Sequence, residues 1–101
     1  MIAVLPAEFH IILDILKKHV PGCQVLVFGS RYKHTHYDAS DLDIAIKGQE
    51  RLPFLKTADI KEDFMESDLP FRVDVVDYHA ISDSFRAIID TGHFKIQIEE
   101  G

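Results

Sequence analysis

The sequence predicts an α/β domain in which strands and helices alternate around a single core. Segments with apolar residues at the three- and four-residue spacing of a helix are separated by short runs rich in β-branched residues. Strands interleaved with helices are typical of an α/β layer architecture. At 101 residues, the chain has room for one sheet and a few covering helices, so we expect a single domain over 1–101.

The first half begins with a predicted helix. Its apolar positions are three or four residues apart: Leu5, Phe9, Ile12, Leu13, Leu16 and Val20. Pro6 suits the first turn of this helix, and Pro21 and Gly22 end it. The apolar run over 24–28 predicts a strand that is covered on both faces. Residues 31–40 are polar and lack an apolar period, which predicts a loop with one helical turn.

The second half repeats the alternation. Residues 41–47 alternate between Asp, Ala or Lys and branched apolar side chains, which predicts a strand with one apolar face. Four further elements are expected: a weakly amphipathic helix over 52–69 that ends before Pro70, a strand over 71–78, a helix from a Ser82 cap to Gly92, and a short edge strand over 93–98.

Composition narrows the classes of partner and compartment. Acidic side chains outnumber basic ones by 17 to 11, for a net charge of −6, and binding to long nucleic acid depends on Lys and Arg neutralising phosphates. Long nucleic acid is therefore not expected as the main partner. Cys23 is the only cysteine, which excludes an intramolecular disulfide and fits a reducing cytoplasm. No apolar run approaches the roughly 20 residues that span a bilayer, so we expect a cytoplasmic protein without a membrane partner.

Three aspartates stand out because aspartate is disfavoured in strands. Asp41 and Asp43 share one face of a predicted strand, about 7 Å apart along the backbone, and Asp74 interrupts a Val-rich strand. If the two strands are neighbours, the three carboxylates converge and need a cation. Mg²⁺ takes oxygen ligands and keeps substrate phosphates in its shell. Asp77 falls on the opposite face of the ideal strand and is expected to be a strand-end residue.

Simpler interpretations of these acids remain open. An Asp-x-Asp pair taken alone is usually a solvated strand end or a turn, and Arg72 is an alternative salt-bridge partner for Asp74. A third carboxylate inside an apolar strand favours the metal site, since a buried carboxylate without a partner is costly.

Residues suited to binding phosphate come shortly before the aspartates in the sequence. Gly29 follows an apolar strand and allows close approach of the backbone to a ligand. The Ser30 hydroxyl and the following amides are donors for phosphate oxygens, and Arg31 and Lys33 in the next loop neutralise phosphate charge.

Histidines and tyrosines near this site have simpler explanations. His34 and His36 are candidates for a transition metal or a general base, but loop histidines are usually solvated and the carboxylates suit Mg²⁺. Tyr37 and Tyr78 are candidates for a base pocket, although packing is the commoner role of a tyrosine.

The combined pattern resembles a known family. Gly29-Ser30, ten intervening residues, Asp41-x-Asp43 and a later Asp74 resemble the polymerase-beta-type nucleotidyltransferase superfamily, and the length resembles its minimal nucleotidyltransferases. The resemblance runs from the first strand through Val76. It implies a polymerase-beta-like fold with a small mixed sheet flanked by helices.

The resemblance also implies roles for single residues. Ser30 contacts the nucleotide phosphates, with Gly29, Arg31 and Lys33 in the same nucleotide-binding loop. Asp41 and Asp43 bind two Mg²⁺ ions, and Asp74 completes one metal site and helps to activate the acceptor. Where many minimal members have a small residue, an arginine and a glycine, this chain has Tyr32-Lys33-His34, which implies an altered phosphate loop.

The implied reaction is attack of an acceptor hydroxyl on the α-phosphate of a nucleoside triphosphate, with ATP as the expected donor and pyrophosphate as the leaving group.

Minimal members typically pair with small helical HEPN-type proteins, so the resemblance implies an antitoxin of a type VII-like toxin–antitoxin pair that adds AMP to a tyrosine of its partner. Homo-oligomerisation is also open. The alternative is a non-catalytic module that binds nucleotide or masks its partner. An aminoglycoside-modifying enzyme is disfavoured because no second domain is expected to hold a sugar.

Overall fold

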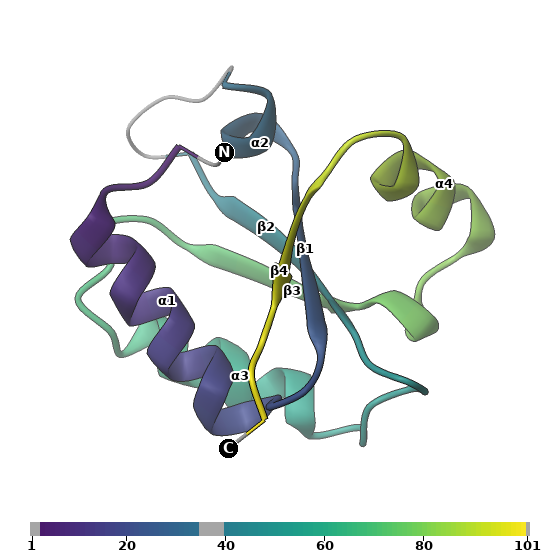
Figure 1. Cartoon of the computed structure of the whole chain (residues 1–101), viewed down its shortest axis with the longest axis horizontal. Helices are drawn as coiled ribbons and strands as arrows, with labels where there is room; N and C mark the ends of the chain where they lie inside the picture. The colour runs from purple at the N-terminus through teal and green to yellow at the C-terminus, as the bar shows by residue number, and fades with distance from the viewer. Residues whose placement is uncertain (1–2, 35–39, 101) are drawn as a thin grey trace.

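The computed structural model describes residues 3–34 and 40–100, and its elements alternate along the chain as expected. In chain order they are α1 (Pro6–His19), β1 (Gln24–Phe28), α2 (Ser30–Lys33), β2 (Leu42–Lys47), α3 (Lys56–Met65), β3 (Val73–Asp77), the 3₁₀ turn η1 (Tyr78–Ala80), α4 (Asp83–Thr91) and β4 (Phe94–Gln97). Figure 1 shows α1 and α3 together on one side of the sheet and α4 on the other.

The four strands form one mixed sheet in the order β3-β2-β1-β4. β1 pairs antiparallel with both β2 and β4, whereas β2 and β3 are parallel. A parallel pair needs a crossover connection, and α3 lies in the segment that makes it. The α/β class and the small mixed sheet flanked by helices are therefore confirmed.

Two apolar clusters cover the two faces of the sheet. The larger one joins α1 and α3 to the sheet through residues such as Leu16, Ile44 and Ile60, all fully buried. The smaller one places Tyr78 and Ile89 against Leu26 and Ala45 on the opposite face. None of the described helices is long and apolar enough to cross a membrane.

The second cluster corrects one expectation about β2. The alternation over 41–47 predicts a strand with a single apolar face, but Ala45 is completely buried on the supposedly open face. The reason is tertiary, because η1 and α4 fold over the middle of the sheet. Asp43, two residues earlier on the same face, is only partly buried.

Two elements are shorter than their patterns predict. The helix expected over 52–69 is limited to Lys56–Met65, and the strand expected over 71–78 is limited to Val73–Asp77. The Asp77 carboxylate accepts the backbone N–H groups of Leu52, at 2.7 Å, and of His79, at 3.0 Å. These bonds cap η1 and end the strand, in agreement with the expected strand-end role of Asp77.

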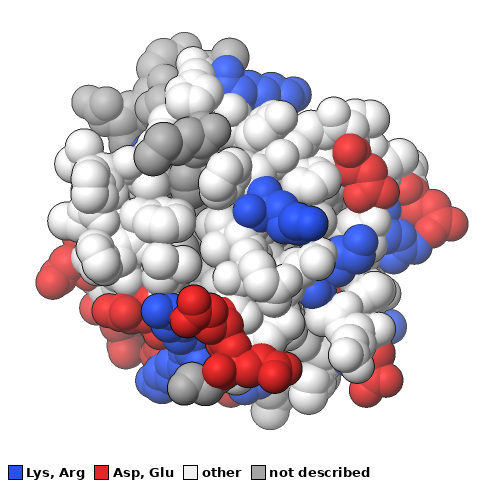
Figure 2. All heavy atoms as spheres, in the orientation of Figure 1, with Lys and Arg blue, Asp and Glu red and all other residues white. Residues whose placement is uncertain are grey.

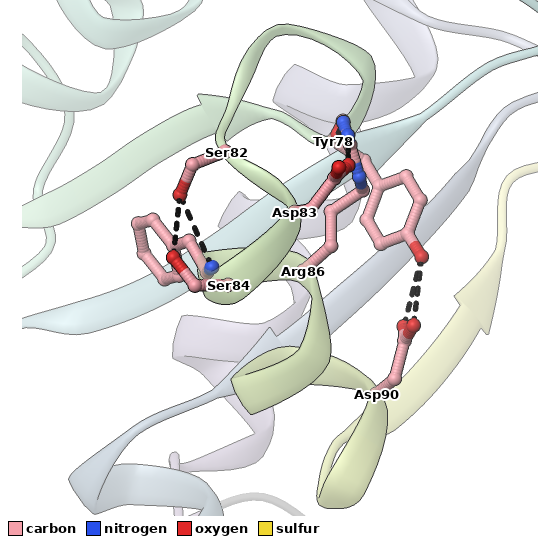
Figure 3. A network of polar contacts seen from close by, with 7 residues as sticks. Tyr78, Ser82, Asp83, Ser84, Arg86 and Asp90 are labelled. Carbon is pink, nitrogen blue, oxygen red and sulfur yellow. Dashed lines mark hydrogen bonds and ion pairs between the residues drawn. The ribbon is translucent and has the colours of Figure 1, made fainter.

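A polar network links α4 to η1, the turn that directly follows β3 (Figure 3). The Ser82 hydroxyl accepts the backbone N–H of Phe85 at 3.2 Å and caps the helix, as predicted. The Tyr78 hydroxyl donates to both carboxylate oxygens of Asp90, at 2.9 and 3.0 Å. This hydrogen bond, with burial, raises the pKa of the Tyr78 phenol. Arg86 donates to the backbone oxygen of Tyr78 at 3.1 Å and pairs with Asp83.

A double-mutant cycle tests the link between Tyr78 and Asp90. We expect Tyr78→Phe and Asp90→Ala each to lower the free energy of unfolding by about 1 kcal/mol, because each removes the same charge-assisted hydrogen bond. The double variant should cost little more than either single one. Urea denaturation followed by circular dichroism measures all four proteins. Fully additive losses would show that the two side chains do not stabilise each other.

Candidate active site

The candidate site lies at the end of the sheet where β1 ends and β2 and β3 begin. In the parallel pair, Asp43 and Asp74 are direct partners across the strands. The N–H of Leu42 donates to the backbone oxygen of Arg72 at 2.9 Å and holds the two strand starts together. Asp41 comes immediately before β2. The predicted convergence of the two acidic segments is therefore confirmed at the level of strand register.

The charges of Asp74 and Asp41 act on the Asp43 carboxylate. Burial raises the pKa of Asp43, and the charges of Asp74 and Asp41 raise it further. Folding therefore makes the ionised form of Asp43 less favourable than it is in the unfolded chain. Below the ordinary aspartate pKa of the unfolded chain, Asp43 is protonated in both states and its ionisation does not lower stability. As the pH rises past the higher pKa of the folded state, Asp43 ionises there too, and the full loss of stability is reached.

Gly29 brings the end of β1 directly against this cluster. Phe28 pairs with Asp43 in the antiparallel register, so the next residue reaches the Asp43 side chain. Gly29 has φ +78°, and a Cβ at this position would overlap the Asp43 carboxylate. The backbone conformation favours glycine, and any side chain here would have to displace the Asp43 carboxylate.

α2 is a single turn that starts at Ser30 directly after this glycine. Lys33 is exposed at its end, and its N–H donates to the backbone oxygen of Gly29 at 3.0 Å. His34 follows in the left-handed conformation, with φ +59°. This is a backbone conformation that glycine adopts more readily than a residue with a side chain. The candidates His36 and Tyr37 lie outside the described residues.

The Arg31 side chain is buried, which its predicted position in a loop did not indicate. Its guanidinium donates to the backbone oxygens of Ala3, at 2.8 Å, and Ser40, at 3.0 Å. It also stacks over the Phe71 ring, 4.0 Å from the ring centre. A phosphate contact by Arg31 stays a prediction, whereas these bonds hold Ser40, the residue before Asp41, against the body of the protein.

The donor set fits a hard divalent cation, although the side chains as placed do not close around one. Within 3–34 and 40–100, no group of three or more His, Cys, Asp or Glu side chains has the arrangement of a metal site. Asp41, Asp43 and Asp74 nevertheless gather negative charge at one end of the sheet, and that charge disfavours ionisation of Asp43. A bound cation would relieve this repulsion, and carboxylate oxygens are the ligands that Mg²⁺ prefers.

Comparison with known proteins identifies the family. The sequence model described as "Polymerase beta, Nucleotidyltransferase" matches residues 11–96. The chain belongs to this nucleotidyltransferase family. A curated relative from Haemophilus influenzae, named probable protein adenylyltransferase MntA, is 45% identical over 93 residues, which cover 92% of this chain and 82% of the relative.

Solved structures share the fold of this nucleotidyltransferase. A toxin–antitoxin complex with AMP-PNP contains a chain with a TM-score of 0.73 and 24% identity, covering 85% of this chain and 69% of that one. An MntA–HepT toxin–antitoxin structure has a TM-score of 0.68 and 21% identity, covering 90% of this chain and 70% of that one. These similarities confirm the polymerase-beta-like fold that the sequence resemblance implies.

Sequence reasoning missed one feature of the candidate site. A groove of about 580 Å³ opens beside Asp41 and Asp74, and its other walls include Lys61 and Met65 on α3 and Arg72 before β3. Lys61 and Met65 lie in a weakly patterned helix, and nothing in their local sequence connects them with the carboxylates. The nearest available signal was Arg72, which stands two residues from Asp74.

Replacing Gly29 tests the packing of the candidate site. We expect Gly29→Ala to lower the free energy of unfolding by about 2 kcal/mol or more, because the new methyl group overlaps Asp43 and the positive φ strains an L-residue. Gly48→Ala is the control, since a Cβ there would make only ordinary contacts, the nearest at 3.4 Å to Cys23. Urea denaturation compares the two variants. Equal stability would contradict the close approach of Gly29 to Asp43.

Removing one carboxylate should stabilise the metal-free enzyme. We expect Asp43→Asn to raise Tm by a few degrees at neutral pH, because it removes a partly buried charge whose pKa is raised by burial and by its neighbours. The gain should shrink as the pH falls toward the ordinary aspartate pKa. Differential scanning calorimetry with chelator measures this difference, and the exposed Asp68→Asn is the control. A lower Tm for Asp43→Asn at neutral pH would argue against repulsion at this site.

Proposed function

We propose that this nucleotidyltransferase transfers AMP from ATP to a hydroxyl group of a protein partner, and that it is the antitoxin of a HepT-type toxin. The observation that carries the chemistry is the register that places Asp43 beside Asp74, with Gly29 against Asp43 at the same end of the sheet. The acceptor class is supported by the 45% identity to the probable protein adenylyltransferase MntA. The partner is supported by the fold shared with MntA in MntA–HepT structures.

Different groups at this end of the sheet bind the phosphates and the metal ions. Ser30 and the first amides of α2 bind the β- and γ-phosphates, and the close approach of Gly29 to Asp43 sets this turn beside the carboxylates. Lys33 is exposed beside this turn and offsets charge on the leaving pyrophosphate. Asp41, Asp43 and Asp74 would hold two Mg²⁺ ions. When bound there, Mg²⁺ supplies charge stabilisation at the α-phosphate and at the leaving oxygen.

The bond changes follow from this arrangement. The acceptor oxygen attacks the α-phosphorus and forms a new P–O bond, while the bond from the α-phosphorus to the bridging oxygen breaks and releases pyrophosphate. Asp74 lies on the edge strand and is exposed. Its carboxylate orients the acceptor hydroxyl and takes the proton that this hydroxyl loses.

Label transfer tests the proposal. Purified protein is incubated with its HepT-type partner, Mg²⁺ and ATP labelled on the α-phosphate. We expect label on the partner, and a loss of at least about 100-fold in rate for Asp41→Asn, Asp43→Asn or Asp74→Asn, because each removes a charge on which the phosphates and the acceptor depend. Label should disappear when Mg²⁺ is chelated.

Asp68→Asn removes an exposed carboxylate outside the site and serves as the control, with an unchanged rate expected. If the wild-type protein transfers no label and the three aspartate variants still neutralise the partner, the protein acts as a non-catalytic masking module instead.

A further inference from the structure

The groove beside Asp41 and Asp74 is lined by both cationic and apolar side chains. It opens along the edge strand β3, between the second half of α3 and residues 69–74. Lys61 and Arg72 bring two cationic side chains to its wall. Met65 adds an apolar side chain that is 83% exposed.

Asp74 lines this groove at the edge of the sheet, so the groove opens next to the carboxylate that we assign to the acceptor hydroxyl. Ser30 follows β1, Asp43 lies on β2 and Asp74 lies on β3, and β2 is the middle strand of the three. In an in-line displacement, the attacking and leaving oxygens lie on opposite sides of the phosphorus. With pyrophosphate leaving toward Ser30, the hydroxyl arrives from the β3 side, where the groove begins.

The charges of the groove indicate which acceptor it fits. Lys61 and Arg72 are both exposed, and neither side chain takes part in an ion pair with any other described residue. On the face drawn in Figure 2, Lys and Arg side chains lie at the centre and toward the α4 side, with others at the upper and lower edges. The whole chain carries a net charge of −6, so an acidic ligand needs local cations. The proposed function places the triphosphate at the Ser30 turn after β1, so Lys61 and Arg72 beside β3 are left for a second acidic group.

We propose that this groove binds the acceptor segment of the protein partner, and that Lys61 and Arg72 select a segment with acidic side chains beside the modified hydroxyl. Met65 contacts the apolar part of that segment. The inference rests on the proposed function, because it requires a protein acceptor. It adds the location of the acceptor and the charge by which the acceptor is recognised.

Charge reversal with a matched control tests this groove. Lys61→Glu/Arg72→Glu is compared with Lys17→Glu/Lys95→Glu, which changes the net charge equally at exposed positions on α1 and β4. Calorimetric titration gives the Kd of the HepT-type partner, in Mg²⁺ and an ATP analogue whose α,β-methylene bridge blocks transfer. Labelled ATP gives the KM for the partner, and binding of the same analogue without partner gives the nucleotide Kd.

We expect the groove variant to weaken partner binding and raise the partner KM by about tenfold or more relative to the control pair, because charge complementarity at the contact is reversed. Its nucleotide Kd should stay within about twofold of the control. Replacing acidic residues beside the modified hydroxyl of the partner with lysine should restore transfer by the groove variant. Circular dichroism checks that both variants are folded.

Two results would overturn the inference: a partner Kd equal to that of the control pair, or a nucleotide Kd weakened as much as the partner Kd, which would place the nucleotide in the groove. A wild-type protein that binds the partner without labelling it would instead refute the proposed transfer reaction. In that case the comparison of partner Kd values still decides whether the groove holds the partner.

Discussion

The position of β2 between β1 and β3 is the constraint on which the site depends. The antiparallel register of β1 sets Phe28 opposite Asp43, and the parallel register of β3 sets Asp74 beside the same residue. Side chains alternate between the two faces of a strand, so a slip of one residue would turn Asp43 into the apolar core between the sheet and helices α1 and α3. Such a slip would also turn the large Ile44 side chain toward the face where the small Ala45 is fully buried. The hydrophobic core therefore fixes the register, and the register assembles the site.

The fold accommodates these carboxylates because they lie outside the hydrophobic core. The middle of β2 is covered on both faces, with Ile44 and Ala45 fully buried on opposite sides. Asp43 lies near the start of the strand, where cover on its face is incomplete and partial exposure limits the cost of its charge. Arg31 supports this end from inside, by holding the segment before Asp41 against Phe71.

Much of the fold was predictable because local patterns and tertiary packing agree. The period of α1, the apolar run of β1 and the Ser82 and Gly92 limits of α4 all appear at the expected positions. The acidic candidates Asp41, Asp43 and Asp74 were also recognisable, since aspartate in an apolar strand is unusual. Arg31 was assigned to a ligand from its loop position, yet its guanidinium bonds to Ala3 and Ser40. Contacts between segments this far apart leave no local pattern.

The sequence by itself determined the class of fold, the order of its elements and the carboxylates available for phosphate chemistry, because periodicity and residue type are local properties. Only the tertiary structure decided that Gly29 touches Asp43, that Ala45 lies under α4, and that Lys61 shares a groove with Asp74. These relations depend on strand pairing and on the packing of helices against the sheet. Both are set by burial summed over the whole chain, which no single segment encodes.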